Sequence, residues 1–114
     1  MDVRISYHPQ FSKDAKRLSK KYKSLISDLK DFVSEIKNNP ELGTDLGHGL
    51  RKVRISIASK GKGKSGGGRI ITYKTIVTEE GYIKIILLTM YDKTEIENVS
   101  DVFLRSLIHS VTEQ

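Results

Sequence analysis

The sequence has no cysteine and no tryptophan, and it holds only two prolines. The lack of cysteine excludes a disulfide framework and a thiolate metal site. No apolar run approaches the ~18 residues that a membrane-spanning helix needs, and the longest, residues 85–88, suits a buried strand. Residues 1–4 also lack the charged and then apolar layout of a secretory signal. These absences together predict a cytoplasmic protein that does not associate with membranes.

Acidic residues are missing from residues 51–77, a stretch that carries eight lysines and arginines. After Tyr91 the balance reverses to five acids and two cations, within a chain of net charge +6. Such segregation favours a polyanionic partner, and cations on strands and a loop suit the phosphates of a nucleic acid. A second basic run, residues 13–30, holds seven cations, but its spacing is typical of the solvated face of a helix.

The length of 114 residues predicts a single domain, residues 1–114, with one modest core. Apolar periodicity indicates a strand, a helical hairpin, a turn-rich connector, three further strands and a last helix. The expected elements are residues 3–7, helices that begin at Phe11 and Ser24 and end before Asn38, and residues 41–49, 50–58, 69–77, 82–91 and 101–112. This order predicts an α+β domain whose last three strands are antiparallel. One sheet face would stay partly open around Arg54, Arg69 and the loop between their strands.

Residues 58–65 match a relaxed phosphate-loop pattern, with alanine in place of the first glycine. Such a loop has to run from a parallel strand into a helix whose N-terminus meets the phosphates. Here three more glycines and a predicted strand follow, so we reject a nucleotide triphosphatase. Glycine amides and the interleaved Lys60, Lys62 and Lys64 still suit phosphate contacts. A hairpin tip that is basic by chance is the competing interpretation.

Histidine and carboxylate chemistry has little support in the sequence. His8, His48 and His109 stand apart, without the spacing of metal ligands. Turn or surface positions explain them best, and His48 is notable only because it precedes the basic strand. The acidic pairs fall in a predicted turn and before the last helix, where neither indicates a metal site.

The remaining candidates for chemistry are cations and tyrosines. Cleavage of RNA by its own 2′-hydroxyl needs a base for the 2′ proton, stabilisation of the dianionic phosphorane, and an acid for the leaving 5′ oxygen. Arginine suits the second task because its planar fork stays charged and matches two phosphate oxygens. A lysine crowded by other cations, or a tyrosine, can transfer a proton. The candidates are Arg54, Arg69, Tyr73, Tyr91 and Lys93.

Several segments follow one another in an order that resembles a known toxin family. They are YHPQF (residues 7–11), a helical hairpin ending in NP (39–40), LGTDLG (42–47), GLRKVR (49–54), GKSGGGRIITY (63–73) and LLTMYDKTE (87–95). Through them the chain resembles the RelE/ParE superfamily of toxins from bacterial toxin–antitoxin pairs, and within it the HigB/RelE-like ribosome-dependent mRNA endonucleases. The last two segments are the most specific.

The resemblance implies two helices packed on a curved antiparallel sheet, and cleavage of mRNA in the ribosomal A site with no metal and no cofactor. It places Lys52 and Arg54 where the family carries basic residues before the loop, and Arg69 on the arginine that opens the next strand. Lys93 falls near the family's basic residue after the last strand. RelE-type enzymes have a functional tyrosine in the C-terminal part, and because none follows Tyr91 here, Tyr91 is the candidate.

The resulting hypothesis is a metal-independent endoribonuclease toxin. Its candidate catalytic residues are Arg54, Arg69, Tyr91 and Lys93, and its candidate contacts to RNA and the ribosome are Lys52, Lys60, Lys62 and Lys64. The family also implies a cognate antitoxin, expected to be a helix-turn-helix protein, that covers the basic surface or displaces part of the fold. Two alternatives stay open: a gyrase poison of the ParE type, and an RNA-binding module, for which stacking aromatics are scarce.

Overall fold

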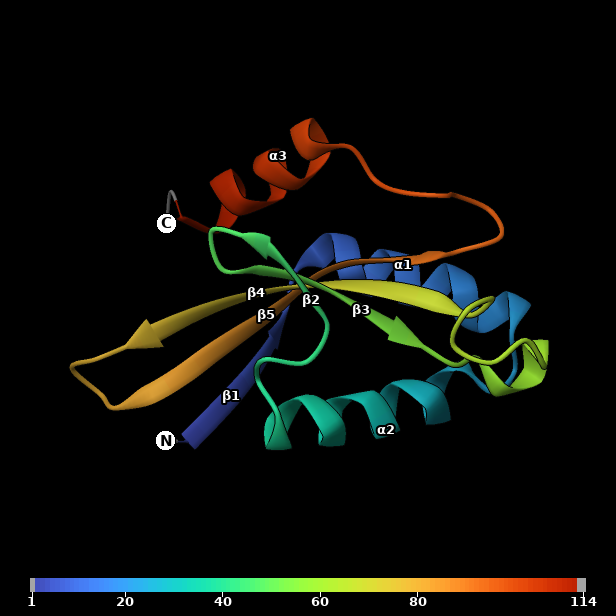
Figure 1. Cartoon of the computed structure of the whole chain (residues 1–114), viewed down its shortest axis with the longest axis horizontal. Coiled ribbons are helices and arrows are strands. Elements are labelled where there is room, and N and C mark those ends of the chain that lie inside the picture. The colour runs from blue at the N-terminus through green and yellow to red at the C-terminus, as the bar shows by residue number, and fades with distance from the viewer. Residues whose placement is uncertain (1, 113–114) are drawn as a thin grey trace.

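The computed structural model describes residues 2–112 and shows a five-stranded sheet with helices on both faces (Figure 1). In chain order the elements are β1 (Asp2–Tyr7), α1 (Pro9–Lys21), α2 (Leu25–Asn38), β2 (Thr44–Gly47), β3 (Leu50–Ile55), the short 3-10 helix η1 (Ala58–Lys60), β4 (Gly68–Val77), β5 (Tyr82–Asp92) and α3 (Asp101–Thr112). The predicted α+β architecture, with its N-terminal strand, helical hairpin and C-terminal helix, is therefore confirmed. No helix within residues 2–112 is long and apolar enough to cross a membrane.

The sheet is mixed, with the strand order β1-β5-β4-β3-β2. The strands from β2 to β5 pair antiparallel, as the hairpins predicted, but β1 lies parallel to β5. The antiparallel sheet that the resemblance implied thus has a parallel strand at this edge. The two helices that follow β1 supply the long crossover that a parallel pair requires, and the His8 amide continues the pairing by donating to the Leu87 carbonyl.

The turn-rich connector also contains a strand that the sequence pattern did not predict. Residues of β2 pair with β3, with Thr44 opposite Lys52 and a register shift before Gly47. Glycines bracket this segment and hid its strand character, since glycine weakens strand patterns. The Arg51 guanidinium holds the connector in place by donating to the carbonyls of Leu42 and Gly43.

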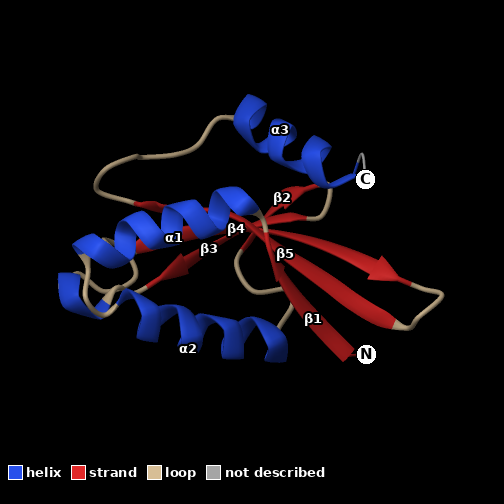
Figure 2. Cartoon of the chain, turned by 180° about the vertical axis from the view of Figure 1, so that it is seen from behind, coloured by secondary structure: helices blue, strands red, loops and turns tan. Residues whose placement is uncertain are grey.

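The main core lies between the sheet and the helical hairpin. The apolar stripe of α1 and α2 faces strand residues that alternate toward the same side, and Figure 2 shows the two helices from that side. The buried side chains of this cluster are Phe11, Leu18, Leu25, Phe32, Ile36, Val53, Ile55, Ile57, Ile70, Ile85, Leu87 and Met90. Burial of this apolar surface is the main force that holds the helices on the sheet.

Helix α3 covers part of the opposite face, which the sequence had led us to expect to be partly open. Its Leu104 and Leu107 pack in a second buried cluster with Leu50, Ile71, Ile86, Leu88 and Tyr91. At its far end, Ser110 Oγ lies 2.7 Å from His8 Nε2. The other ring nitrogen of His8, Nδ1, accepts from the Gln10 amide, so His8 both caps α1 and links it to α3.

The glycine-rich loop closes onto the end of β3 so tightly that one position excludes a side chain. A Cβ atom on Gly67 would lie 2.1 Å from the Ile55 carbonyl oxygen. The Gly67 carbonyl, in turn, accepts from the Lys93 amide at 3.0 Å. Gly67 therefore joins the loop to the ends of β3 and β5 through its backbone.

We expect Gly67→Ala to lower the free energy of unfolding by about 2 kcal/mol, because a methyl group there forces two backbone segments apart. Ser65→Ala, in the same loop, is the control, since its side chain is exposed and the change adds no atom to the loop. Urea denaturation of both variants measures the difference. Equal stability of the two would contradict the close approach described for Gly67.

Candidate nucleic-acid interface

Three of the four candidate catalytic residues form one row across the sheet. Arg54 on β3 lies opposite Arg69 on β4, and Arg69 lies opposite Tyr91 on β5. Residues that are paired across neighbouring strands point to the same face, and Tyr91 packs in the cluster under α3. The row is therefore on the α3 face, where Lys52, two residues before Arg54, also belongs by strand alternation. We call Arg54, Arg69 and Tyr91 the cationic row.

Arg69 is the buried member of the cationic row, with 4% of its surface exposed. Its Nη1 donates to the carbonyls of Lys64 (2.9 Å) and Gly68 (3.0 Å), and its Nη2 donates to the carbonyl of Ser65 (3.1 Å). Burial, helped by the neighbouring Arg54, lowers the pKa of Arg69 from its ordinary value. The fork of Arg69 thus shapes the glycine-rich loop while it adds positive charge below the surface.

Tyr91 is also buried, with 2% exposed, beneath the segment that joins β5 to α3. Its hydroxyl lies 3.3 Å from Asn98 Oδ1, to which it donates. Burial raises the pKa of Tyr91, and the nearby Arg69 only partly opposes this shift. The hydroxyl therefore keeps its proton at neutral pH, which suits a proton donor better than a base.

Arg54 is the exposed member of the cationic row. Within residues 2–112 its side chain makes no hydrogen bond or ion pair, although acids of α2 line the same small cavity of about 120 Å³. Lys93, the fourth catalytic candidate, lies just beyond β5 and outside the row. Its ammonium group donates to the Glu97 carbonyl at 2.9 Å, so it braces the segment that covers Tyr91.

The three lysines of the glycine-rich loop have different surroundings. Lys62 and Lys64 are exposed, and among the described residues their side chains have no hydrogen-bond or ion-pair partner. The side chain of Lys60 is only 5% exposed, and its Nζ lies 2.6 Å from Asp92 Oδ1. Lys60 therefore anchors the loop and is not placed to hold a phosphate, unlike the two lysines that follow it.

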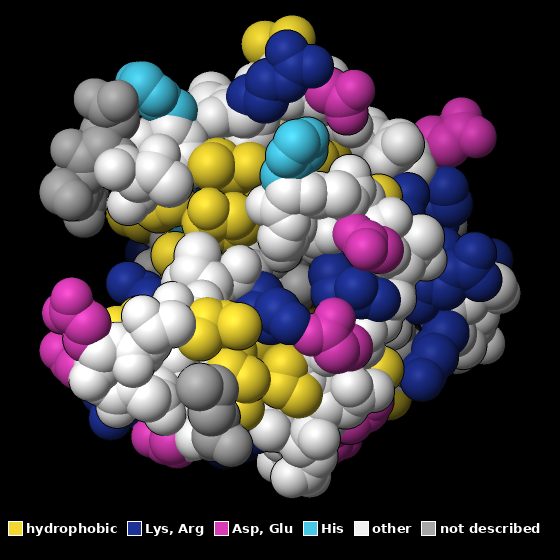
Figure 3. Space-filling model, turned by 60° about the vertical axis from the view of Figure 1, so that its left-hand side comes forward, with side chains coloured by type: hydrophobic (Ala, Val, Ile, Leu, Met, Phe, Trp, Pro, Cys, Tyr) yellow, Lys and Arg dark blue, Asp and Glu magenta, His cyan; other side chains and the backbone are white. Residues whose placement is uncertain are grey.

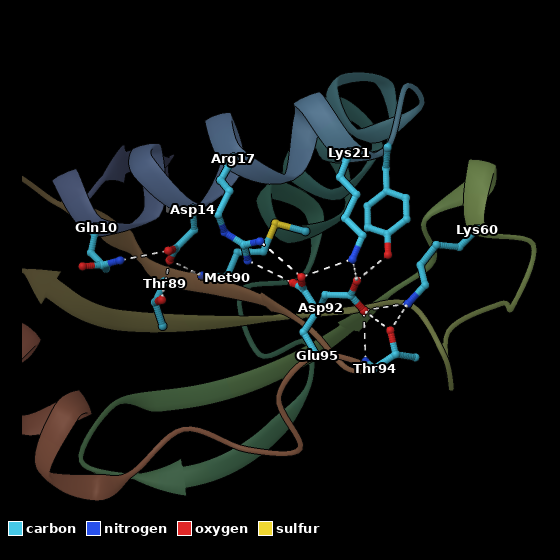
Figure 4. Close-up of polar contacts among 11 residues, drawn as sticks. Gln10, Asp14, Arg17, Lys21, Lys60, Thr89, Met90, Asp92, Thr94 and Glu95 are labelled. Atoms are coloured by element: carbon cyan, nitrogen blue, oxygen red, sulfur yellow. Dashed lines mark hydrogen bonds and ion pairs between the residues drawn. The ribbon is translucent and has the colours of Figure 1, made fainter.

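Asp92, at the end of β5, is the centre of this anchor (Figure 4). The carboxylate is fully buried and accepts hydrogen bonds from Lys60, from the Tyr22 hydroxyl, and from both the amide and the hydroxyl of Thr94. Burial alone would raise the pKa of Asp92, but these donors together outweigh burial and hold the pKa well below its usual range.

A second carboxylate ties the segment after β5 to α1. Glu95 pairs with Arg17 at 3.0 Å and with Lys21 at 3.1 Å, as Figure 4 also shows. These donors lower the pKa of Glu95, with the Arg17 hydrogen bond as the largest cause. Two cations of the basic run on α1 are thus engaged within the protein, and Lys20 between them remains on its surface.

The eight cations of residues 51–77 fall into two groups: those whose side chains are bound within the protein and those whose side chains are not. Arg51 and Lys74 pair with Glu41, Lys60 pairs with Asp92, and Arg69 donates to loop carbonyls. Within residues 2–112, four side chains have no such partner: Lys52, Arg54, Lys62 and Lys64. The positive charge that can meet an external anion is thus concentrated on β3 and in the loop. On the face shown in Figure 3, lysines and arginines gather along one side.

Sequence reasoning missed the central position of Asp92 and the role of Tyr22. Local periodicity assigned Tyr22 to a helix face and gave Asp92 no task, because their contact joins residues 70 positions apart. The only local signal was an acid directly after a buried strand. Among residues 2–112 we find no group of three or more His, Asp or Glu side chains that could hold a metal ion. No family model matches the chain.

Asp92→Asn should lower the free energy of unfolding at pH 7 by about 3 kcal/mol, because it leaves the buried Lys60 ammonium without its anion. The pKa of Asp92 is lowered in the folded state, so its contribution is complete above the unfolded value of about 4 and declines as the pH falls below it. The difference in the free energy of unfolding between wild type and variant should therefore become smaller from pH 7 to pH 3. Urea denaturation across this range measures it.

The matched control is Asp31→Asn, which changes an exposed carboxylate without a partner among the described residues. It should change stability by less than about 0.5 kcal/mol at every pH. If wild type and Asp92→Asn differ in the free energy of unfolding by the same amount at pH 7 and pH 3, a charged, buried Asp92 is ruled out.

Proposed function

We propose that this protein is the toxin of a type II toxin–antitoxin pair and a ribosome-dependent mRNA endonuclease. The observation that carries the proposal is the cationic row, in which two arginines lie side by side with no carboxylate paired to either among residues 2–112. The resemblance of the sequence to HigB/RelE-like toxins supports it independently. The substrate would be mRNA in the ribosomal A site.

A phosphate group is the anion that best fits this row. Adjacent guanidinium groups repel each other, and the lowered pKa of Arg69 reflects that repulsion as well as burial. An anion bound against Arg54 relieves this repulsion. The electrostatic stabilisation is larger for a doubly charged phosphorane than for a singly charged diester. The row therefore favours the transition state of phosphoryl transfer over its ground state.

The reaction would be transesterification by the RNA itself. The 2′ oxygen attacks the adjacent phosphorus, a 2′,3′-cyclic phosphate forms, and the bond to the 5′ oxygen breaks. Arg54 would stabilise the charge that develops on the phosphorane, with Arg69 behind it. Tyr91 would donate a proton to the 5′ oxygen, because its raised pKa keeps the hydroxyl protonated. Opening of the segment around Asn98 would give the hydroxyl access.

The row contains no group suited to remove the 2′ proton. Both arginines stay protonated, and Tyr91 holds its proton at neutral pH. Lys93 is the remaining candidate from the sequence, and its ammonium group donates to the Glu97 carbonyl. A site that lacks its own base suits an enzyme that works only on the ribosome, where the bound RNA and its surroundings complete the chemistry.

The partners follow from the same surface. The unpaired cations Lys52, Lys62 and Lys64 would bind phosphate groups of the mRNA or of the ribosomal RNA. A cognate antitoxin would neutralise the protein by covering these cations or by displacing part of the fold. A gyrase poison of the ParE type would not need the cationic row, and a plain RNA-binding module would not need Tyr91 beside it.

We expect Arg54→Ala to slow mRNA cleavage on programmed ribosomes by at least about 100-fold, as loss of one oxyanion donor does in other enzymes. Its free energy of unfolding should stay within about 0.5 kcal/mol of wild type, because the side chain is exposed and unpaired. Single-turnover cleavage followed by primer extension measures the rate. Arg69→Ala is less informative, since it also removes the clamp on the loop.

Lys37→Ala, an exposed and unpaired lysine on α2, is the control and should cleave at the wild-type rate. Full activity of Arg54→Ala would remove the cationic row from the mechanism. Cleavage of naked mRNA at the same rate as ribosomal mRNA would contradict dependence on the ribosome. Intact mRNA together with damaged DNA would favour the gyrase poison instead.

A further inference from the structure

A cavity of about 580 Å³ lies between α3 and the hairpin of β2 and β3. Its floor is apolar and includes the buried side chains of Leu50, Ile71 and Leu104. Its polar lining consists of His48, Lys52, Asn98, Asp101 and Arg105. An apolar floor with a few polar groups is the usual construction of a site for a small ligand. Figure 3 shows hydrophobic side chains exposed among basic ones on this side of the molecule.

The cavity adjoins the cationic row. Lys52 lines the cavity and lies on the same strand face as Arg54. Asn98, another lining residue, accepts the hydroxyl hydrogen bond of Tyr91. A nucleotide whose phosphate meets the row could therefore place its base in the cavity without crossing the sheet.

The backbone at His48 is held in a conformation that non-glycine residues rarely adopt. Its φ is 55°, between Gly47 and Gly49, which both have a φ of 86°. No other non-glycine residue within residues 2–112 has a positive φ. His48 and Gly49 are the two central residues of the turn between β2 and β3, where a tight hairpin requires a positive φ at both positions, and histidine is among the non-glycine residues that adopt it most often. This turn places the imidazole on the cavity wall.

Four of the five polar side chains around the cavity are free to bind a ligand, Asn98 being the exception. Among the described residues, His48, Lys52, Asp101 and Arg105 have no side-chain hydrogen bond or ion pair. Asp101 and Arg105 lie four residues apart on α3, so they share one helix face. Although they could pair with each other, they do not, and both line the cavity. The cavity thus offers a carboxylate acceptor beside a guanidinium donor.

This pair has the hydrogen-bonding pattern that guanine requires. Guanine presents two acceptors, O6 and N7, which arginine can contact with both arms of its fork. It also presents N1–H and N2–H, which a carboxylate accepts. Adenine would place an amino group against the arginine, and uracil has no two adjacent acceptors. Cytosine offers the carboxylate a single amino group in place of the two neighbouring N–H donors of guanine. Single-stranded RNA is read through such base edges and through stacking on side chains such as histidine.

We propose that this cavity binds the guanine of one nucleotide of the RNA, with Arg105 and Asp101 reading its edge and His48 stacking on it. The inference rests on the proposed function for its substrate class. It assigns base selection to α3 and the β2–β3 hairpin, apart from the cationic row that handles phosphate.

The test uses the full chain and four RNA trinucleotides, UGU, UAU, UCU and UUU, in which 2′-O-methyl groups prevent cleavage. Affinities come from ¹H–¹⁵N NMR titrations. We expect UGU to bind about tenfold more tightly than the others and to shift the amide signals of His48 and Arg105. Arg105→Ala and Asp101→Asn should each abolish the preference, while Lys16→Ala, on the other face of the sheet, should leave it unchanged.

Equal affinity for the four trinucleotides, signal shifts confined to other residues, or a preference that survives both α3 variants would overturn the proposal. Ribosomal cleavage measured in parallel separates it from the proposed function. Cleavage without any base preference would overturn the guanine pocket alone. Guanine-selective binding without cleavage would overturn the endonuclease and leave the pocket standing.

Discussion

The arrangement of the candidate interface depends on the burial of one carboxylate. Asp92 carries a negative charge and has no surface exposed to solvent, so the fold must supply positive charge and hydrogen-bond donors around it. Lys60 meets that need and brings the start of the glycine-rich loop to the end of β5. Tyr22 and Thr94 complete the shell and fix the end of α1 and the segment after β5. Because Asp92 lies opposite Gly68 in the sheet, the same contact sets the loop beside the cationic row.

Most elements could be predicted from the sequence because their signals are local. Alternating apolar residues and helical periodicity gave the β3, β4 and β5 strands and the three α-helices near their observed bounds. The direction of β1, the strand β2 and the face taken by α3 were not predictable in this way. Each of them depends on contacts between distant segments, such as β1 with β5 or His8 with Ser110, which leave no mark in a short window of sequence.

In the candidate site, too, some features could be predicted from local sequence and others depend on contacts between distant segments. The sequence identified the basic stretch, and the sheet aligns Arg54, Arg69 and Tyr91 in one row. Nothing in the pattern distinguished Lys60 from Lys62 or Lys64, since all three lie among glycines. Only the buried partner of Lys60 separates an internal anchor from cations that face outward. Charge counted along a chain therefore overstates the charge offered to a partner.

The parallel pairing of β1 with β5 affects the order in which the molecule can form during synthesis. Strand β1 leaves the ribosome well before its partner, which begins at Tyr82, so its edge stays unpaired until β5 has been synthesised. Pairings between such distant segments are also the slow ones in folding. Tyr91 and Asp92 lie at the far end of the same late strand. An incomplete chain therefore holds the lysines and arginines of β3 and the loop before it can order them, and the surface becomes organised only when β5 takes its place between β1 and β4.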